Sequence, residues 1–126
     1  MSGVLVDTCV WVDHFKRRND TLVDLLASDR VLSHPMIVGE LACGTPPFRR
    51  QTLLDLEGLQ PVRQASIREV MDLVERDRLF GLGCGVVDLM LLASARMTPG
   101  VVLWTLDRRL NALAQRYGMT HPAARL

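Results

Sequence analysis

A chain of 126 residues, 48% of them hydrophobic and 23% charged, has the size and composition of one globular domain. Its net charge of +1 excludes a strong overall electrostatic attraction to nucleic acid or to a membrane surface. Contacts with nucleic acid would therefore have to come from local basic clusters. Three widely spaced cysteines form neither a disulfide framework nor a zinc motif and indicate a reducing compartment. We find no signal-peptide pattern and no membrane-spanning run, and we expect residues 1–126 to form a single cytoplasmic domain.

The first half of the chain predicts short apolar strands that alternate with helices. Asn19 or Asp20 can cap the second helix, Pro35 suits the first turn of the third, and Gly58 ends the fourth. Strands are expected at residues 3–7 and 31–33, and helices at residues 8–15, 20–27, 35–43 and 48–57.

The second half continues the alternation. Pro61 restricts residues 59–62 to a weak edge strand. Ser66 and Glu69 match the capping-box pattern, and the helix after them has apolar residues at helical spacing, namely Ile67, Val70, Met71 and Val74. A flexible loop is expected at residues 81–85, a strand at 101–105, and helices at 66–79, 86–97 and 107–117.

Such alternation predicts an α/β fold, a three-layer α/β/α sandwich with a short, mostly parallel central sheet. The helix at residues 86–97 is apolar on nearly all sides and should therefore be central. Sites in these folds form at the carboxyl ends of the strands, and Asp7 and Asp107 fall at two such ends.

Four acidic residues stand alone in otherwise uncharged stretches of the chain. A single charged residue occurs in each of three stretches, residues 2–12, 31–48 and 79–95. A fourth uncharged stretch begins at residue 97 and ends at an acidic residue. These residues are Asp7, Glu40, Asp88 and Asp107. A carboxylate in a stretch that the chain would bury must find a partner, become protonated or hold a cation.

Each acid also has a plain structural interpretation. Asp7 and Asp107 can cap the helices that follow them, Asp88 lies in a first helical turn that favours a carboxylate, and Glu40 can reach solvent at a rim. Their joint isolation favours a shared cation, and oxygen ligands without paired His or Cys favour Mg²⁺ over zinc. Such a site indicates phosphoryl chemistry with a metal-activated water, in which the hydroxyls of Thr8 or Thr105 could hydrogen-bond a water or a phosphate.

Four segments in series resemble the PIN-domain ribonucleases, and most closely the VapC toxins of type II toxin–antitoxin pairs. The segments read V-L-V-D-T-C-V-W around Asp7, G-E-L around Glu40, V-V-D-L-M-L-L-A-S-A around Asp88, and L-W-T-L-D-R-R-L through Thr105 and Asp107. The resemblance covers nearly the whole chain, in order and at the usual spacing.

The resemblance implies a Mg²⁺- or Mn²⁺-dependent endoribonuclease that cleaves tRNA or rRNA. Asp7, Glu40, Asp88 and Asp107 would be its metal-site acids, and Thr105 a supporting hydroxyl. It also implies a homodimer and inhibition by a VapB-type antitoxin, whose C-terminal segment occupies the active-site groove. A last strand should follow residue 118, although the tail there is short.

Arg108 and Arg109 follow the last acid directly, so at least one of them could meet an RNA phosphate. Two other classes of function remain open. A catalytically silent module of the same fold would only bind an antitoxin or regulatory partner. A phosphatase or phospho-receiver is disfavoured, because Cys9 stands where a phosphoaspartyl enzyme would carry a second aspartate.

Overall fold

The structure, a computed structural model, describes residues 3–122. Short strands separated by one or two helices follow one another along the described residues, which form seven helices and four strands. The order agrees with the sequence prediction except for the strand expected after residue 118. The elements are β1 (Gly3–Val6), α1 (Thr8–Lys16), α2 (Asp20–Ala27), β2 (Val31–Ser33), α3 (Pro35–Ala42), α4 (Arg49–Glu57), β3 (Gln60–Pro61), α5 (Ile67–Asp77), α6 (Val86–Met97), β4 (Val101–Trp104) and α7 (Arg108–Arg116).

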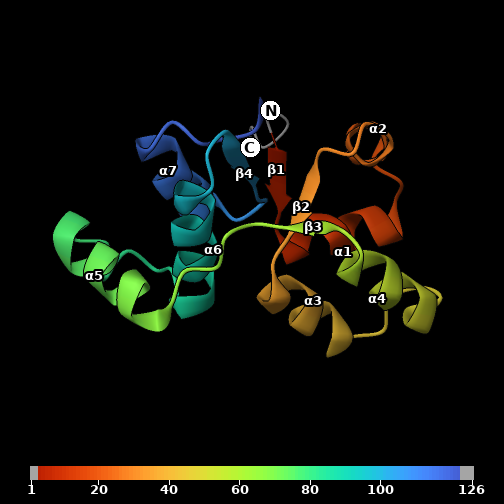
Figure 1. The fold of residues 1–126 in the computed structure, drawn as a ribbon, viewed down its shortest axis with the longest axis horizontal. Coiled ribbons are helices and arrows are strands. Elements are labelled where there is room, and N and C mark those ends of the chain that lie inside the picture. The colour runs from red at the N-terminus through yellow and green to blue at the C-terminus, as the bar shows by residue number, and fades with distance from the viewer. Residues whose placement is uncertain (1–2, 123–126) are drawn as a thin grey trace.

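The four strands form one parallel sheet in the order β3-β2-β1-β4. Helices α1 to α4 lie on one side of the sheet, and α5, α6 and α7 lie on the other (Figure 1). This three-layer arrangement confirms the predicted α/β sandwich. The short strand β3 is at an edge, where the missing N–H of Pro61 costs no ladder hydrogen bond.

The core is centred on β1 and α6. All four residues of β1 are buried, and seven consecutive residues of α6, Leu89 to Ala95, are buried as well. This explains why the sequence of α6 is apolar on nearly every side: the helix contacts α5, α7 and β4 together. Ser94 is fully buried there, and its hydroxyl accepts a hydrogen bond from the backbone N–H of Ala65 at 3.0 Å.

Two details differ from the sequence prediction. Ile67 and Met71, which were assigned to the apolar face of α5, are 54% and 49% exposed, whereas Val70 and Leu73 are buried. The helix is therefore rotated so that Leu73, rather than Met71, packs on α6. The strand expected after residue 118 is only an isolated parallel bridge between Leu103 and Thr120, since the segment is too short to add a ladder.

The capping interactions follow the sequence closely. The Asn19 side chain accepts a hydrogen bond from Leu22 N, and Ser66 and Glu69 form the expected reciprocal capping box on α5. Within residues 3–122, no helix combines the length and the apolar character needed to cross a membrane.

Candidate active site

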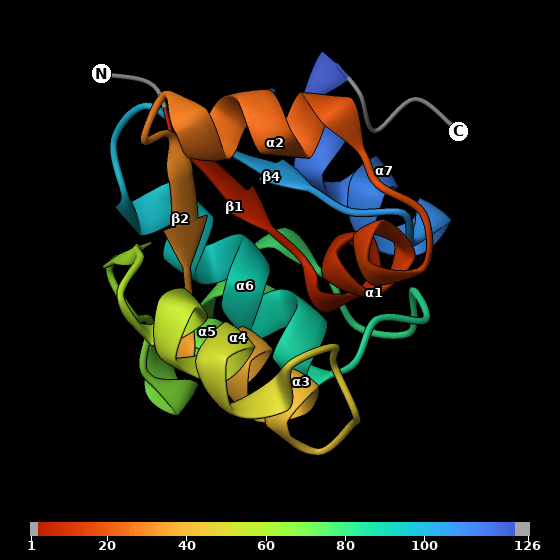
Figure 2. The ribbon, with the colours of Figure 1, turned by 90° about the vertical axis from the view of Figure 1, so that its right-hand side faces the viewer.

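All four isolated acids line one cavity of about 490 Å³. Asp7 follows β1 and Asp107 lies three residues after β4, so the two neighbouring parallel strands bring these residues to the same edge of the sheet. Glu40 comes from the second half of α3, and Asp88 from the first turn of α6. Figure 2 shows β1 leading directly into α1 at this edge.

Asp7 is held more tightly than the other three acids. Its side chain is only 7% exposed, and its Oδ1 accepts a hydrogen bond from Thr8 N at 2.8 Å, which caps α1. Its Oδ2 accepts a hydrogen bond from the hydroxyl of Thr105 at 2.8 Å. The Thr105 oxygen in turn accepts one from Asp107 N at 3.0 Å. The buried Thr105 hydroxyl therefore ties the ends of β1 and β4 together.

The other three acids each use one carboxylate oxygen within the protein. Glu40 Oε1 accepts a hydrogen bond from the Thr8 hydroxyl at 2.7 Å, and Asp107 Oδ1 accepts one from Leu110 N at 2.9 Å, which caps α7. Asp88 Oδ2 accepts a long one, 3.4 Å, from Gly85 N. Within residues 3–122, the second oxygen of each of these three acids has no hydrogen-bond partner, so each remains available to a ligand.

The negative charge of the cavity is not neutralised by ion pairs. In the described part of the chain, none of the four acids forms a salt bridge with Lys or Arg. Burial raises the pKa of Asp88, and the carboxylates of Asp7, Asp107 and Glu40 raise it further, against the opposing Gly85 N–H. The four acids therefore sense one another electrostatically, and a bound cation would relieve their repulsion.

The cavity also includes Asp13, together with Lys16 and Cys9, to which the sequence analysis gave no role there. The thiol of Cys9 donates to Asp7 Oδ2 at 3.4 Å and accepts from Leu106 N at 3.3 Å. Burial and the charge of Asp7 raise the pKa of this thiol. The spacing of Thr8, Val12 and Lys16 on one face of α1 was the available signal for Lys16.

Arg108 and Arg109 are exposed and lie outside the lining of the cavity. Arg109 instead covers the glycine loop: a Cβ atom added to Gly83 would come within 2.6 Å of Arg109 Cδ. Gly83 has a φ of +85°, a backbone conformation that favours glycine, whereas the flexible end of Arg109 could move aside for a Cβ atom. Burial raises the pKa of the neighbouring Cys84 thiol, as do Asp88 and Asp107, whereas Arg109 lowers it, which locates this guanidinium near the acidic edge.

The donor set fits a hard divalent cation. Asp7, Glu40, Asp88 and Asp107 offer only oxygen atoms to the cavity, and three of them keep a free oxygen. Within residues 3–122, no three His, Cys, Asp or Glu side chains are already grouped closely enough to enclose an ion. A hard cation such as Mg²⁺ keeps several waters and needs only one or two direct carboxylates.

Comparison with known proteins agrees with this architecture. Residues 4–116 match the PIN domain family. The chain is 40% identical over 116 residues to two curated proteins, both named Ribonuclease VapC32, from Mycobacterium tuberculosis strains CDC 1551 / Oshkosh and ATCC 25618 / H37Rv. In each case the alignment covers 92% of this chain and 94% of the relative. The chain belongs to the PIN domain family, among relatives that carry the name VapC.

Proposed function

We propose that the protein is a metal-dependent endoribonuclease that acts as the toxin of a toxin–antitoxin pair. The observation that carries this proposal is the cavity lined by Asp7, Glu40, Asp88 and Asp107, four carboxylates without a cationic partner among the described residues, on a PIN-family fold. The name of the VapC32 relatives, ribonuclease, supports RNA as the substrate. Transfer RNA and ribosomal RNA are the substrate classes that we propose.

In this proposal Asp7, Asp88, Glu40 and Asp107 hold Mg²⁺ or Mn²⁺ directly or through waters. When bound, the ion would lower the pKa of a water and neutralise charge on the scissile phosphate. Thr105 orients Asp7 from a fully buried position. Thr8 plays the same part for Glu40, so a threonine fixes each of these two carboxylates. Such supporting hydrogen bonds keep ligand oxygens in place before the cation arrives.

In this proposal Glu40 and Asp107, which are exposed and line the cavity, hold waters. Their free oxygens can accept hydrogen bonds from a nucleophilic water and so orient it toward the phosphate. Burial raises the pKa of Asp88, and the carboxylates of Asp7, Asp107 and Glu40 raise it further, against the opposing Gly85 N–H. A cation bound nearby would favour the charged form of Asp88.

The partners follow from the same proposal. A VapB-type antitoxin would inhibit the enzyme by placing a C-terminal segment in the active-site groove, and the chain would form a homodimer. Arg108 and Arg109, both exposed beside the acidic edge, would contact RNA phosphates. Cys9, Cys43 and Cys84 are all free thiols, which supports a reducing, cytoplasmic setting.

The test is to replace Asp7 or Asp88 with asparagine, which keeps the shape of the side chain and removes its charge. We expect cleavage of cellular RNA to fall by about 100-fold or more in each variant, because weakened metal ligation costs at least that much. The growth arrest caused by induction of the protein should disappear as well. Cleavage sites are mapped by sequencing RNA ends after induction.

Asp24→Asn is the matched control, since Asp24 is exposed on α2 and outside the cavity. It should cleave as the wild type does. Unchanged cleavage in both Asp7→Asn and Asp88→Asn would refute the proposed site. A wild-type protein that cleaves no RNA with either Mg²⁺ or Mn²⁺, but binds its antitoxin, would favour the catalytically silent module.

A further inference from the structure

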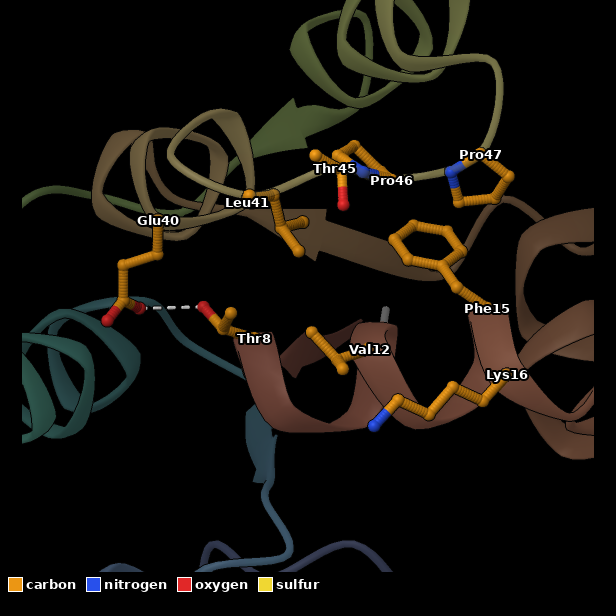
Figure 3. A pocket seen from close by; sticks show the side chains of 10 residues that line it. Thr8, Val12, Phe15, Lys16, Glu40, Leu41, Thr45, Pro46 and Pro47 are labelled. Carbon is orange, nitrogen blue, oxygen red and sulfur yellow. Dashed lines mark hydrogen bonds between the residues drawn. The ribbon is translucent and has the colours of Figure 1, made fainter.

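A second cavity, of about 360 Å³, adjoins the acidic cavity. The two cavities share four lining residues, Thr8, Val12, Lys16 and Glu40. The hydrogen bond between Thr8 and Glu40 lies at the boundary (Figure 3). A polymer whose phosphate lies at the carboxylates would therefore place an adjacent unit over this second cavity.

The walls of the second cavity are apolar and rigid. The ring of Phe15 lies beside Pro46 and Pro47, and Val12 and Leu41 face the same space (Figure 3). The ring of Phe15 also packs near Trp11, which is buried, with the two ring centroids 6.1 Å apart. An aromatic ring has a flat face that suits a planar heterocycle, and a proline ring has few conformations.

The cavity also has a polar side. The hydroxyl of Thr45 points into the space between Leu41 and Phe15, and Lys16 extends back along α1 toward Val12 (Figure 3). Although Glu40 and Asp13 are close by, Lys16 forms no ion pair or hydrogen bond within residues 3–122. The Lys16 ammonium lies at the boundary between the two cavities. It could therefore bind an anionic group, such as a phosphate, that links a group in one cavity to a group in the other.

We propose that this second cavity is a nucleobase subsite for the nucleotide next to the scissile phosphate. Phe15 stacks on the base, Thr45 hydrogen-bonds its polar edge, and Lys16 contacts the connecting phosphate. A volume at the lower end of the range of about 300–1,000 Å³ for ligand sites suits one heterocycle rather than a larger group. The inference rests on the proposed ribonuclease function and adds a specificity determinant to it.

The subsite accepts only a base that is free to leave its neighbours. A base within a duplex is stacked and paired and cannot enter the space beside Phe15. The substrate would therefore be a single-stranded segment or a loop. An apolar side chain of a protein partner could also fill the pocket. Its continuity with the acidic cavity, through shared lining residues that include Lys16 and Glu40, favours the nucleotide.

The test combines Phe15→Leu with base deletion in the RNA. The wild type cleaves a short single-stranded RNA that carries a mapped site, and the same RNA with an abasic ribose on either side of the scissile bond. We expect one abasic position to lower kcat/KM by about ten- to a hundredfold, the usual loss when a stacked base is removed. Phe15→Leu should show that loss with intact RNA and little further loss with abasic RNA.

Controls separate this effect from damage to the fold. Phe80→Leu makes the same change at an exposed aromatic residue outside both cavities and should leave both rates unchanged. Lys16→Gln should raise KM while sensitivity to the abasic position remains. Thermal unfolding of Phe15→Leu checks that its core packing survives.

Three outcomes would overturn the subsite. In the first, the wild type is active but no abasic position lowers its kcat/KM. In the second, Phe15→Leu and base deletion each lower kcat/KM and their effects multiply when combined. In the third, Phe15→Leu changes only the inhibition by the antitoxin. If the wild type cleaves no RNA, the proposed function fails, but the subsite can still be tested. Nucleoside 5′-monophosphates titrated into the full chain should then shift the amide resonances of Val12 and Thr45 in the wild type and not in Phe15→Leu.

Discussion

At the scale of single residues, the acids of the cavity combine structural contacts with the role that we propose for them in the site. Asp7 and Asp107 cap α1 and α7, and Asp88 contacts the backbone at the start of α6. A cap uses one lone pair of a carboxylate, so the remaining lone pairs stay available to the cavity. The structural and the functional interpretations of these residues are therefore compatible, because the helix starts are what orient the carboxylates.

Thr105→Val tests whether orientation of Asp7 matters to the chemistry. The change keeps the side-chain shape but removes the hydroxyl that donates to Asp7 and accepts from Asp107 N. We expect a loss of about 1–3 kcal/mol in the free energy of unfolding, because buried polar groups lose their partners. RNA cleavage should fall by about 10- to 100-fold, as is usual when a group that orients a metal ligand is removed.

Thr98→Val is the matched control, measured by urea unfolding and cleavage assays in parallel. Its hydroxyl likewise makes two hydrogen bonds, to Ser94 O and from Arg63 N, but it lies outside the cavity. It should lower stability without slowing the cleavage of folded protein. Equal cleavage by Thr105→Val and Thr98→Val would show that Thr105 only stabilises the fold.

At the scale of elements, short strands and well-capped helices bring the side chains of the site together. Parallel pairing of β1 with β4 aligns the residues that follow them, and α3 extends from β2 to bring Glu40 to the same edge. The start of α3 depends on His34, a buried N-cap whose Nδ1 accepts from Met36 N at 3.0 Å. Accepting this bond requires that Nδ1 carries no proton.

His34 should make stability depend on pH. Burial lowers its pKa below the ordinary 6.5, so the folded state favours the neutral ring. The contribution of neutral His34 to the free energy of unfolding is fully present above pH 6.5, the ordinary pKa of histidine. It is lost as the pH falls from 6.5 toward the lower pKa that His34 has in the folded state. Within that window, this loss is at most about 1.4 kcal/mol for each pH unit. His34→Asn keeps a good cap and removes the titration.

Urea unfolding of the wild type and of His34→Asn at about pH 7.5 and pH 5.5 measures this contribution. The wild type should lose more stability than the variant on acidification. Burial also lowers the pKa of His121, so some loss should remain in His34→Asn. A stability difference between the two proteins that is the same at both pH values would contradict the assignment to His34.

At the scale of the whole molecule, a net charge of +1 gives RNA little general attraction, and the active-site cavity is itself acidic. Affinity must therefore come from a few local cations. Arg109 lies over the glycine loop near Asp88 and Asp107, whereas exposed Arg50 lies on α4, outside the lining of the acidic cavity. Position, rather than total charge, should decide which arginine contributes.

Arg109→Gln and Arg50→Gln change the net charge equally, from +1 to 0. Binding of single-stranded RNA, measured against salt concentration in an Asp88→Asn background that leaves the RNA intact, distinguishes them. Arg109→Gln should lower the slope of log affinity against log salt by about 0.7, the value for one lost phosphate contact. Arg50→Gln should leave the slope unchanged. Equal slopes in both variants would mean that Arg109 contacts no phosphate.

The order and type of the elements could be predicted from the sequence because their signals are local. Strand runs such as Val4 to Val6, the Ser66 capping box and Gly118 act within a few residues, and local rules describe them. The isolation of Asp7, Glu40, Asp88 and Asp107 was also visible, since an uncharged stretch is a property of the linear chain. The sequence therefore determined the fold class and nominated the four acids.

Only the tertiary structure decided which of these residues meet and what accompanies them. Sheet order and helix rotation decide the cavity shared by the four acids, the Thr105 link between Asp7 and Asp107, and the position of Lys16 beside Phe15. The same rotation left Met71 exposed and buried Leu73, against the prediction for α5. These features depend on contacts between segments far apart in the chain, and local patterns contain no information on such contacts.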